Sequence, residues 1–454
     1  MNALGSTPSH SLPKFIHLLA LSMLVLVSAL TFSNRSAHAM DIEVVKSPGG
    51  IEAWLVRETS VPLVAMRFFF DGGSSQDPDG KEGLANFLSV MLDEGAGDLD
   101  AQTFQRRLEE LAVRLSFSDG RDTFTVSMQT LSKNLDPATD LLKLALTKPT
   151  FGEKAVTRMR SYLLTRLAAA QKNPNQIVAK TWSATAFPGH PYGRPSGGTL
   201  ESVAAITSAD LEAYRKRVFA RDTLKIAVVG DIDAKTLGPL LDKLFGDLAA
   251  TADLNPVPEI APVTGGVNKV VTFPVPQSVA IFGMGSISRT DRDFIPAFVM
   301  NHILGGGGFS SKLMQEVREK RGLAYSVYSY LQPFDRSSIF AGGVATKNDK
   351  IGESLTIIRE QFQQMADNGP DPADLKAAIQ YLTGSYALRF DTNSKVAQQL
   401  LGILQDELGL DYIKERNDLI RAVTAEDVKR AADRIIKTDD LIVTVVGNPV
   451  GWPG

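Results

Sequence analysis

Four consecutive glycines are the residues whose type and spacing most clearly invite a chemical interpretation: Gly305, Gly306, Gly307 and Gly308. An ordinary helix interior would be unfavourable for them, because each glycine there costs about 1 kcal/mol relative to alanine. The run therefore predicts a flexible loop whose bare backbone can approach another group closely. Phosphate binding is one chemistry that such a loop can perform.

The phosphate-loop interpretation fails on the spacing. Residues 305–312 read GGGGFSSK, which does not match G-x-x-x-x-G-K-[ST], because Lys312 follows a serine and not a glycine. We also expect no strand–loop–helix unit of the βαβ type around this stretch. We therefore reject phosphate binding. Ser310 or Ser311 is instead expected to cap a short amphipathic helix, and residues 323–330 are expected to form a strand.

Histidines limit the metal chemistry that the chain can support. The sequence has five, of which three lie in the first 39 residues, so only His190 and His302 remain beyond them. There is no cysteine. A transition-metal site would need carboxylates, or a convergence of these two distant histidines. We expect both to be structural, because His302 ends an apolar helix and His190 lies in a Pro/Gly-rich loop.

Residues 1–39 have the pattern of a secretory signal peptide. Lys14 precedes the apolar run 15–32, and Ala37-His38-Ala39 gives a small-x-small cleavage site before Met40. The alternative is a retained membrane anchor, because the run is close to the ~20 residues that a bilayer requires. The prediction is a periplasmic or secreted protein with no membrane association after cleavage.

The remaining composition is that of a globular protein with a substantial core. Hydrophobic residues make up 44% and charged residues 22% of the chain. The net charge of −3 becomes −5 when Lys14 and Arg35 are removed with the signal peptide. A mildly acidic chain gives no indication of a nucleic-acid partner. Without cysteines, an exported chain must rely on its core and not on disulfides.

The chain contains an internal duplication. Residues 206–230 read ITSADLEAYRKRVFARDTLKIAVVG and residues 423–447 read VTAEDVKRAADRIIKTDDLIVTVVG. The two align at a constant offset without a gap, so that Thr207 matches Thr424 and Asp210 matches Asp427. Each copy predicts a threonine-capped helix followed by an apolar strand.

The other expected elements follow the same order in both halves. In the first half, strands are expected at 51–55, 61–70 and 123–128, and helices at 82–93, 101–115, 134–148, 152–171 and 175–186. In the second half, strands are expected at 270–273, 279–284, 323–330 and 338–344, and helices at 291–303, 348–366, 371–388 and 393–407. The Pro/Gly-rich segment 253–267 predicts a linker between domains 40–252 and 268–454. We predict two homologous α+β domains, each an antiparallel sheet covered on one face by helices.

Two motif regions resemble a known family. They are GGGGFSSKL with REKRGLAYSVYS in the second half, and GGSS (72–75) with GLANFLSVML (83–92) in the first. The chain resembles the pitrilysin-type, or inverted-zincin, peptidases over nearly all of its mature length. It is most similar to the short bacterial members that are like the mitochondrial processing peptidase.

The resemblance implies that the zinc site is absent from this chain. Active members carry H-x-x-E-H, whose two histidines hold zinc and whose glutamate activates water. The matching positions here are Asn86, Ser89 and Val90. The family's third ligand is a glutamate shortly before an Asn-Pro pair, and the matching positions are Thr165 and Arg166. We expect no metal in this chain, and Asn86 to be a structural polar residue rather than a weak ligand.

The resemblance also implies that half of a catalytic site is retained. Active members use an arginine and, seven residues later, a tyrosine, which match Arg318 and Tyr325. Both can donate hydrogen bonds to the oxyanion that forms during peptide hydrolysis, and arginine can also bind substrate carbonyl groups. The four glycines and Phe309 are implied to contact an extended peptide substrate.

Three functions are compatible with this pattern. The leading hypothesis is a non-metal-binding subunit of an exported zinc peptidase, which forms a heterodimer with a homologous chain carrying H-x-x-E-H and zinc. The second is a non-enzymatic peptide-binding or scaffold protein. The third is an autonomous metallopeptidase with unusual ligands.

Overall fold

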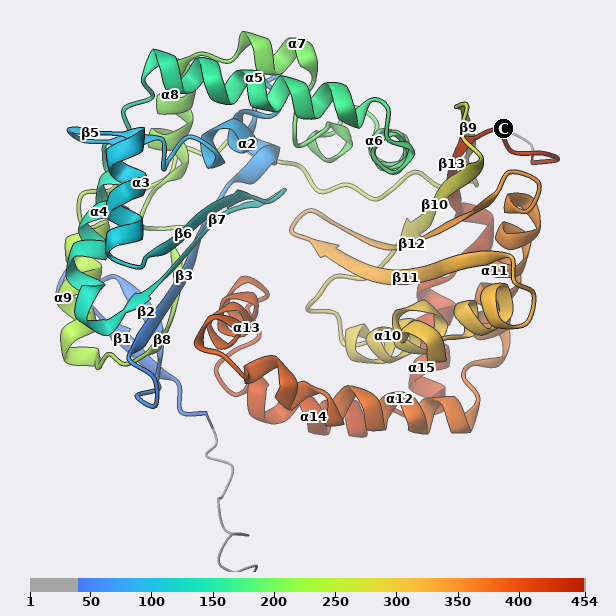
Figure 1. The fold of residues 1–454 in the computed structure, drawn as a ribbon. Helices are drawn as coiled ribbons and strands as arrows, with labels where there is room; N and C mark the ends of the chain where they lie inside the picture. Colours follow the sequence, from blue (N-terminus) through green and yellow to red (C-terminus); the bar gives the residue numbers. More distant parts are fainter. Residues whose placement is uncertain (1–39, 453–454) are drawn as a thin grey trace, which may run out of the picture. The chain divides into compact units, whose positions relative to one another are not determined.

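Two sheets organise residues 40–452, the part of the chain that the computed structural model describes (Figure 1). The first has the order β1-β2-β8-β3-β7-β6. Its strands are β1 Glu43–Lys46, β2 Glu52–Arg57, β3 Leu63–Asp71, β6 Arg114–Asp119, β7 Thr123–Leu131 and β8 Lys225–Gly230. The predicted signal peptide lies outside the described residues. None of the helices in the described part is long and apolar enough to cross a membrane.

The second sheet repeats the topology of the first. Its order is β11-β12-β10-β13-β9, which matches β6-β7-β3-β8-β2 strand for strand. The strands are β9 Asn268–Thr272, β10 Gln277–Gly285, β11 Ala324–Phe334, β12 Ser337–Lys347 and β13 Ile442–Gly447. The predicted duplication of an α+β unit is confirmed.

The repeated segments have the same local structure in both halves. They form α8 (Ser208–Val218) with β8, and α15 (Ala425–Ile435) with β13. Thr207 and Asp210 make a reciprocal capping box, and so do Thr424 and Asp427. Each cap satisfies backbone donors at a helix start that would otherwise lack partners.

The prediction of purely antiparallel sheets is wrong at one pair in each half. β8 pairs antiparallel with β3 but parallel with β2, and β13 pairs antiparallel with β10 but parallel with β9. Parallel strands cannot be joined by a tight turn, and here the segments from β2 to β8 and from β9 to β13 contain other strands and most of the helices of each half.

Helices cover the sheets and enclose one apolar core in each half. In the first half they include α3 Ala101–Glu110, α4 Leu135–Thr147, α5 Glu153–Ala170, α6 Pro174–Ala186, α7 Leu200–Ala205 and α9 Ala234–Phe245. In the second half they include α10 Phe294–Asn301, α11 Ile351–Asn368, α12 Pro372–Gly384, α13 Asn393–Gln405 and α14 Tyr412–Arg421. Phe70 of β3 stacks on Phe219 at 4.6 Å between ring centroids, and both side chains are buried. Each such ring contributes about 2–3 kcal/mol through burial.

The prediction that helices cover only one face of each sheet is also wrong. α13, from the second half, packs against β3 and β8 of the first sheet, while α6, from the first half, packs against β10 and β13 of the second (Figure 1). Asn393 Nδ2 donates to the Leu63 carbonyl at 3.3 Å, and Trp182 Nε1 donates to the Ile442 carbonyl at 3.2 Å. The two halves therefore exchange a helix, and each helix covers the second face of the other half's sheet.

The segment that joins the halves contains neither helix nor strand between residues 252 and 267. It is nevertheless held along its length. Asn255 N donates to Gln76 Oε1 at 2.8 Å, and Val263 N donates to the Ala186 carbonyl at 3.0 Å. The apolar side chains of Val257 and Ile260 pack against the same cluster as Trp182.

Two predicted helices of the first half are shorter than expected. α2 spans only Leu84–Ser89, within the predicted 82–93. The predicted helix 101–115 ends at Glu110, because Ala112 takes a positive φ of 51° and Arg114 starts β6. β6 was missed because its alternating residues directly follow a helical pattern.

Candidate functional site

The predicted flexible glycine loop is wrong for its first two residues. α10 continues into a π-helical turn, His302–Gly306, so Gly305 and Gly306 are helical. A Cβ at Gly305 would lie 2.4 Å from the backbone nitrogen of Ser329 in β11. Glycine is used here because the helix lies directly against a strand, and no side chain fits between them. The predicted close approach occurs, but within the chain itself.

The end of the glycine run turns the chain toward the next helix. Gly308 has a φ of 60° and begins a short 3₁₀ turn with Phe309 and Ser310. Of the two predicted caps, Ser311 lies at the helix start. Its hydroxyl donates to the Gly308 carbonyl at 2.8 Å and accepts from Met314 N at 3.5 Å.

Arg318 lies in a second π-helical turn, Met314–Glu319. Such wide turns are uncommon and often occur at functional sites. The Arg318 guanidinium lies 4.6 Å from the Phe309 ring centroid and 4.7 Å from that of Tyr325. The structure thus brings together Arg318, Tyr325 and Phe309, three residues that the sequence resemblance selected. Contacts of this kind hold a guanidinium in place without neutralising it.

Tyr325 lies at a bulge in β11, which sets the direction of its side chain. Pairing with β12 passes from Ala324–Thr346 to Ser326–Ala345, so Tyr325 is the extra residue. Bulges redirect a side chain away from the regular alternation of a strand. The Tyr325 side chain is 82% exposed and Phe309 is 66% exposed. Sequence reasoning could not find the bulge, because it depends on pairing with β12.

The charges around Arg318 leave its guanidinium largely available. Glu316 forms ion pairs with Lys320 at 2.5 Å and Arg321 at 2.6 Å, and hydrogen bonds from both lower the pKa of Glu316. Arg318 contacts only Glu319 among the described carboxylates, with a separation of 3.4 Å between Nε and Oε1. Its terminal nitrogens remain free to bind a ligand oxygen.

Carboxylates hydrogen-bond to the helix that matches the zinc motif. Asn86 Nδ2 donates to Asp119 Oδ1 at 2.8 Å, and Ser89 Oγ donates to the Asn86 carbonyl at 2.8 Å. Asp77 accepts from Gly83 N and Ala85 N at 2.8 and 2.9 Å, which fixes the start of α2. Burial raises the pKa of Asp77 to about 7.

Thr165 and Arg166 match the position of the family's third metal ligand, and Arg166 influences the pKa of Asp119. Thr165 Oγ1 donates to the Ser161 carbonyl of its own helix, and the Arg166 guanidinium lies 5.5 Å from the Tyr162 ring centroid. Burial raises the pKa of Asp119, and the positive charge of Arg166 is among the effects that oppose this rise. The Asp119 carboxylate thus accepts a hydrogen bond from the Asn86 amide, and the positive charge of Arg166 favours its ionised form. Sequence reasoning missed it because β6 was not predicted.

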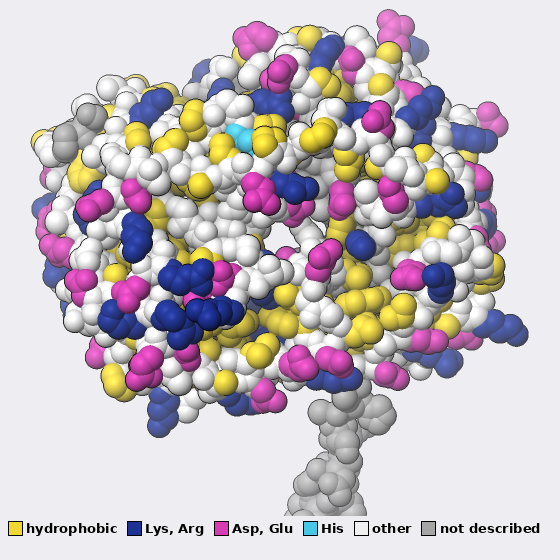
Figure 2. Space-filling model, turned by 180° about the vertical axis from the view of Figure 1, so that it is seen from behind, with side chains coloured by type: hydrophobic (Ala, Val, Ile, Leu, Met, Phe, Trp, Pro, Cys, Tyr) yellow, Lys and Arg dark blue, Asp and Glu magenta, His cyan; other side chains and the backbone are white. Residues whose placement is uncertain are grey.

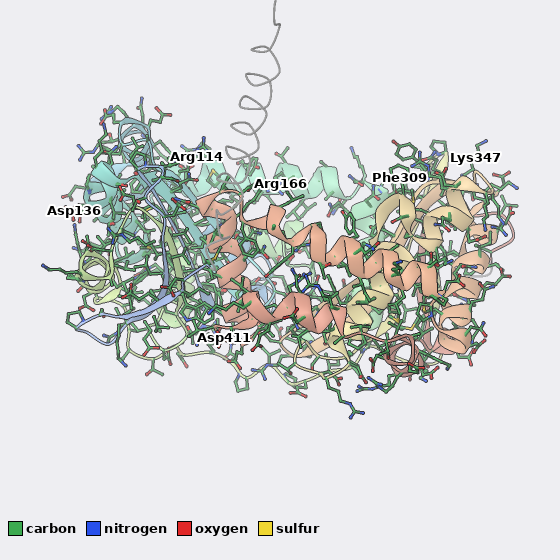
Figure 3. All side chains as sticks on the ribbon, turned by 90° about the horizontal axis from the view of Figure 1, so that it is seen from below. Arg114, Asp136, Arg166, Phe309, Lys347 and Asp411 are labelled. Atoms are coloured by element: carbon green, nitrogen blue, oxygen red, sulfur yellow. The ribbon has the colours of Figure 1, made fainter. Side chains whose placement is uncertain are left out.

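Residues 40–452 contain no cluster of three or more His, Cys, Asp or Glu that could hold a metal ion. The two histidines do not converge. His302 stacks on Tyr381 at 5.1 Å, whereas His190 is buried and bonds to the Pro258 carbonyl at 2.9 Å. Figure 3 shows Phe309 and Arg166 at separate places on different halves of the chain.

Comparisons with known proteins match both halves. Residues 54–200 match the family described as Insulinase (Peptidase family M16), and residues 205–382 match the Peptidase M16 inactive domain. A crystal structure titled as a peptidase M16 inactive domain, from Pseudomonas fluorescens, superimposes with a TM-score of 0.85 at 26% identity. It covers 91% of this chain and 99% of that one.

Similar proteins carry contrasting names. An uncharacterized zinc protease of Rickettsia bellii is 23% identical over 88% of this chain and 96% of its own length. The non-peptidase homolog YmxG of Helicobacter pylori is 24% identical over 96% of this chain and 98% of its own length. These findings confirm the resemblance and the two-domain α+β fold. The chain belongs to the M16, or insulinase, family of peptidases, and residues 205–382 match the domain described as inactive in that family.

Proposed function

We propose that this chain is the non-metal-binding subunit of an exported zinc peptidase. It supplies Arg318 and Tyr325 to a composite site, and a homologous partner chain supplies the H-x-x-E-H motif and its zinc. The observation that carries the proposal is the exposed contact of Arg318 with Tyr325 and Phe309. The positions that match the H-x-x-E-H motif instead hold Asn86 and Val90, in place of the two histidine ligands, and Ser89, in place of the water-activating glutamate.

The two side chains suit the stabilisation of an oxyanion. Tyr325 is largely exposed, and the one carboxylate that Arg318 meets within residues 40–452 faces its Nε, so the Tyr325 hydroxyl and the Arg318 terminal nitrogens are accessible. Both groups can therefore donate to a carbonyl oxygen as it gains negative charge during attack by water. Metal in the partner would activate that water. Fixed donors of this kind typically contribute about 10²–10³-fold to the rate each.

The glycine run and Phe309 complete the proposed peptide contact. Gly308 is exposed, with open space where a Cβ would lie, and it directly precedes Phe309, which has a largely exposed ring. An extended peptide can lie along this surface with its reacting carbonyl between Arg318 and Tyr325. Export to the periplasm or the medium is part of the proposal and is supported by the signal-like pattern of residues 1–39.

The test is to purify the chain alone and together with an exported homologue that carries H-x-x-E-H, and then to measure peptide cleavage. The mixture should be active and each chain alone much less so. Arg318→Ala and Tyr325→Phe should each lower kcat of the mixture about 100-fold or more. Zinc content of the partner and formation of the complex should not change.

The matched controls are a neighbouring arginine and another exposed tyrosine. Arg321→Ala removes a neighbouring guanidinium that is already paired with Glu316. Tyr381→Phe removes the hydroxyl of another exposed tyrosine, on α12. Both controls should retain full activity. A mixture that stays fully active with Arg318→Ala and Tyr325→Phe rules out the composite site.

A non-enzymatic peptide-binding protein is the second candidate, and the name of the Helicobacter pylori relative favours it. It predicts that peptides bind to the chain but that no pairing with a motif-bearing homologue produces zinc-dependent cleavage. The same mixing experiment therefore separates the two functions.

A further inference from the structure

An arginine-rich cavity lies between the first sheet and the helices of the second half. It has a volume of about 650 Å³, within the range of ligand pockets. Its walls come from β3, β7, α10, β11, α13, α14 and the turn before α13. Nothing described above for Arg318 and Tyr325 uses this cavity.

Positively charged residues outnumber negatively charged ones in the wall of the cavity. The charged residues are four arginines and one aspartate, namely Arg67, Arg289, Arg389, Arg416 and Asp406. Arg289 pairs with Asp406 at 3.0 Å, which leaves three arginines without an ion pair among the described residues. Figure 2 shows one outer face of the molecule, where acidic side chains lie among the basic ones and a group of Lys and Arg side chains gathers on one side. The lining of the cavity carries an excess of positive charge, because only one of its four arginines has a carboxylate partner there.

Two of these arginines, Arg416 and Arg67, are held in position, and Arg67 also has a buried donor without a partner among the described residues. Arg416 is buried, lies 4.0 Å from the Tyr386 ring centroid and donates to the Leu382 carbonyl at 3.2 Å. Arg67 Nη2 donates to Ser394 Oγ at 3.3 Å, while its buried Nε has no hydrogen-bond partner within the described residues. A buried donor without a partner is costly, and an oxyanion is the group that would satisfy it.

β11 connects the cavity to the Arg318–Tyr325 pair. Tyr325 lies near the start of this strand, and Tyr330, Leu331 and Pro333 line the cavity farther along it. Tyr330 follows Tyr325 by five residues, which corresponds to about 17 Å of extended strand. A peptide that lies along β11 with one residue at Tyr325 would reach the cavity about five residues away.

We propose that this cavity binds an aspartate or glutamate side chain of an extended peptide. The position of that residue, about five from the cleaved bond, rests on the function proposed above. The binding itself does not, because Arg67, Arg389 and Arg416 belong to this chain alone. The guanidinium groups provide paired donors that match a carboxylate, and the tyrosine rings provide an apolar wall for the rest of the side chain.

Binding of fluorescent peptides to the purified chain, without any partner, tests the site. Two short peptides would differ only in a Glu-to-Gln replacement of a central acidic segment. The Glu peptide should bind at least about tenfold more tightly, and salt should weaken its binding but not that of the Gln peptide. Because no cleavage is measured, loss of the composite site would leave this result unchanged.

Variants connect the binding to the cavity. Arg389→Gln and Arg67→Gln should each weaken the Glu peptide about tenfold and leave the Gln peptide unchanged. Arg389 is exposed at the cavity, so its replacement should preserve the fold. Arg107→Gln, an exposed arginine on α3, is the matched control and should have no effect.

Three results would overturn the proposal. One is equal affinity for the Glu and Gln peptides. Another is unchanged affinity for the Glu peptide in Arg389→Gln. The third is displacement of the peptide by inorganic phosphate at similar concentration, because the cavity would then be a site for small anions and not for peptide carboxylates.

Discussion

At the scale of single residues, two carboxylates, those of Asp77 and Asp119, organise α2. Asp77 caps the start of the helix and Asp119 binds the amide of Asn86. The resemblance predicted that Asn86 was structural rather than a ligand, and its hydrogen bond to Asp119 gives it that role. Of the residues at the motif positions, Asn86 and Ser89 thus make hydrogen bonds within the chain, and Val90 is apolar.

Asp77 makes stability depend on pH near neutrality. Burial raises its pKa to about 7 in the folded chain, above the usual value of 3.8. The folded state therefore binds this proton more tightly, so stability rises as pH falls through 7 toward 4. The free energy of unfolding should increase by about 1 kcal/mol between pH 8 and pH 6 from this group.

Urea unfolding at the two pH values measures this effect. Asp77→Asn should remove this increase in the free energy of unfolding between pH 8 and pH 6. It should also lower stability throughout, because an amide cannot accept from both Gly83 N and Ala85 N. An Asp77→Asn variant with the same pH dependence as the natural chain would show that another group titrates.

At the scale of elements, the sequence was informative where local signals act. The capping boxes of α8 and α15 depend on residues three apart, so the duplication was visible in the sequence. The prediction of a flexible loop at the glycines was wrong because Gly305 packs against the backbone of Ser329 in β11, a contact between residues far apart in the sequence. The bulge at Tyr325 and the exchange of α6 and α13 depend on pairing across the chain. Local patterns do not carry that information.

The close packing of Gly305 against β11 leads to a prediction about stability. A methyl group there would meet the Ser329 backbone at 2.4 Å, and a backbone atom cannot move aside easily. Gly305→Ala should lower the free energy of unfolding by about 1–3 kcal/mol, as overpacked sites do. Thermal unfolding followed by circular dichroism would measure the loss.

Gly384→Ala is the control, because Gly384 ends α12 and has no atom near the position of a new Cβ. It should be neutral, or more stable by up to about 1 kcal/mol, since alanine favours helix. Equal behaviour of the two variants would show that the approach of Gly305 to β11 is not tight in solution.

At the scale of the whole molecule, the exchanged helices decide whether the halves can act separately. α13 covers β3 and β8, and α6 covers β10 and β13. Removal of one half would expose an apolar sheet face of the other. We therefore expect residues 42–452 to unfold as one cooperative unit, even though each half has its own core.

Trp182 is the residue with which to test that coupling. It belongs to α6, is buried against the second sheet, and a Cβ on Gly283 of β10 would lie 2.7 Å from its ring. Trp182→Ala should cost about 3–5 kcal/mol, as large buried aromatics do. Hydrogen exchange in increasing urea should show β3 and β10 losing protection together, in the natural chain and in the variant. If β10 loses protection in the variant while β3 keeps it, the halves are independent, and the exchanged helices only cover sheet faces without joining the two cores into one folding unit.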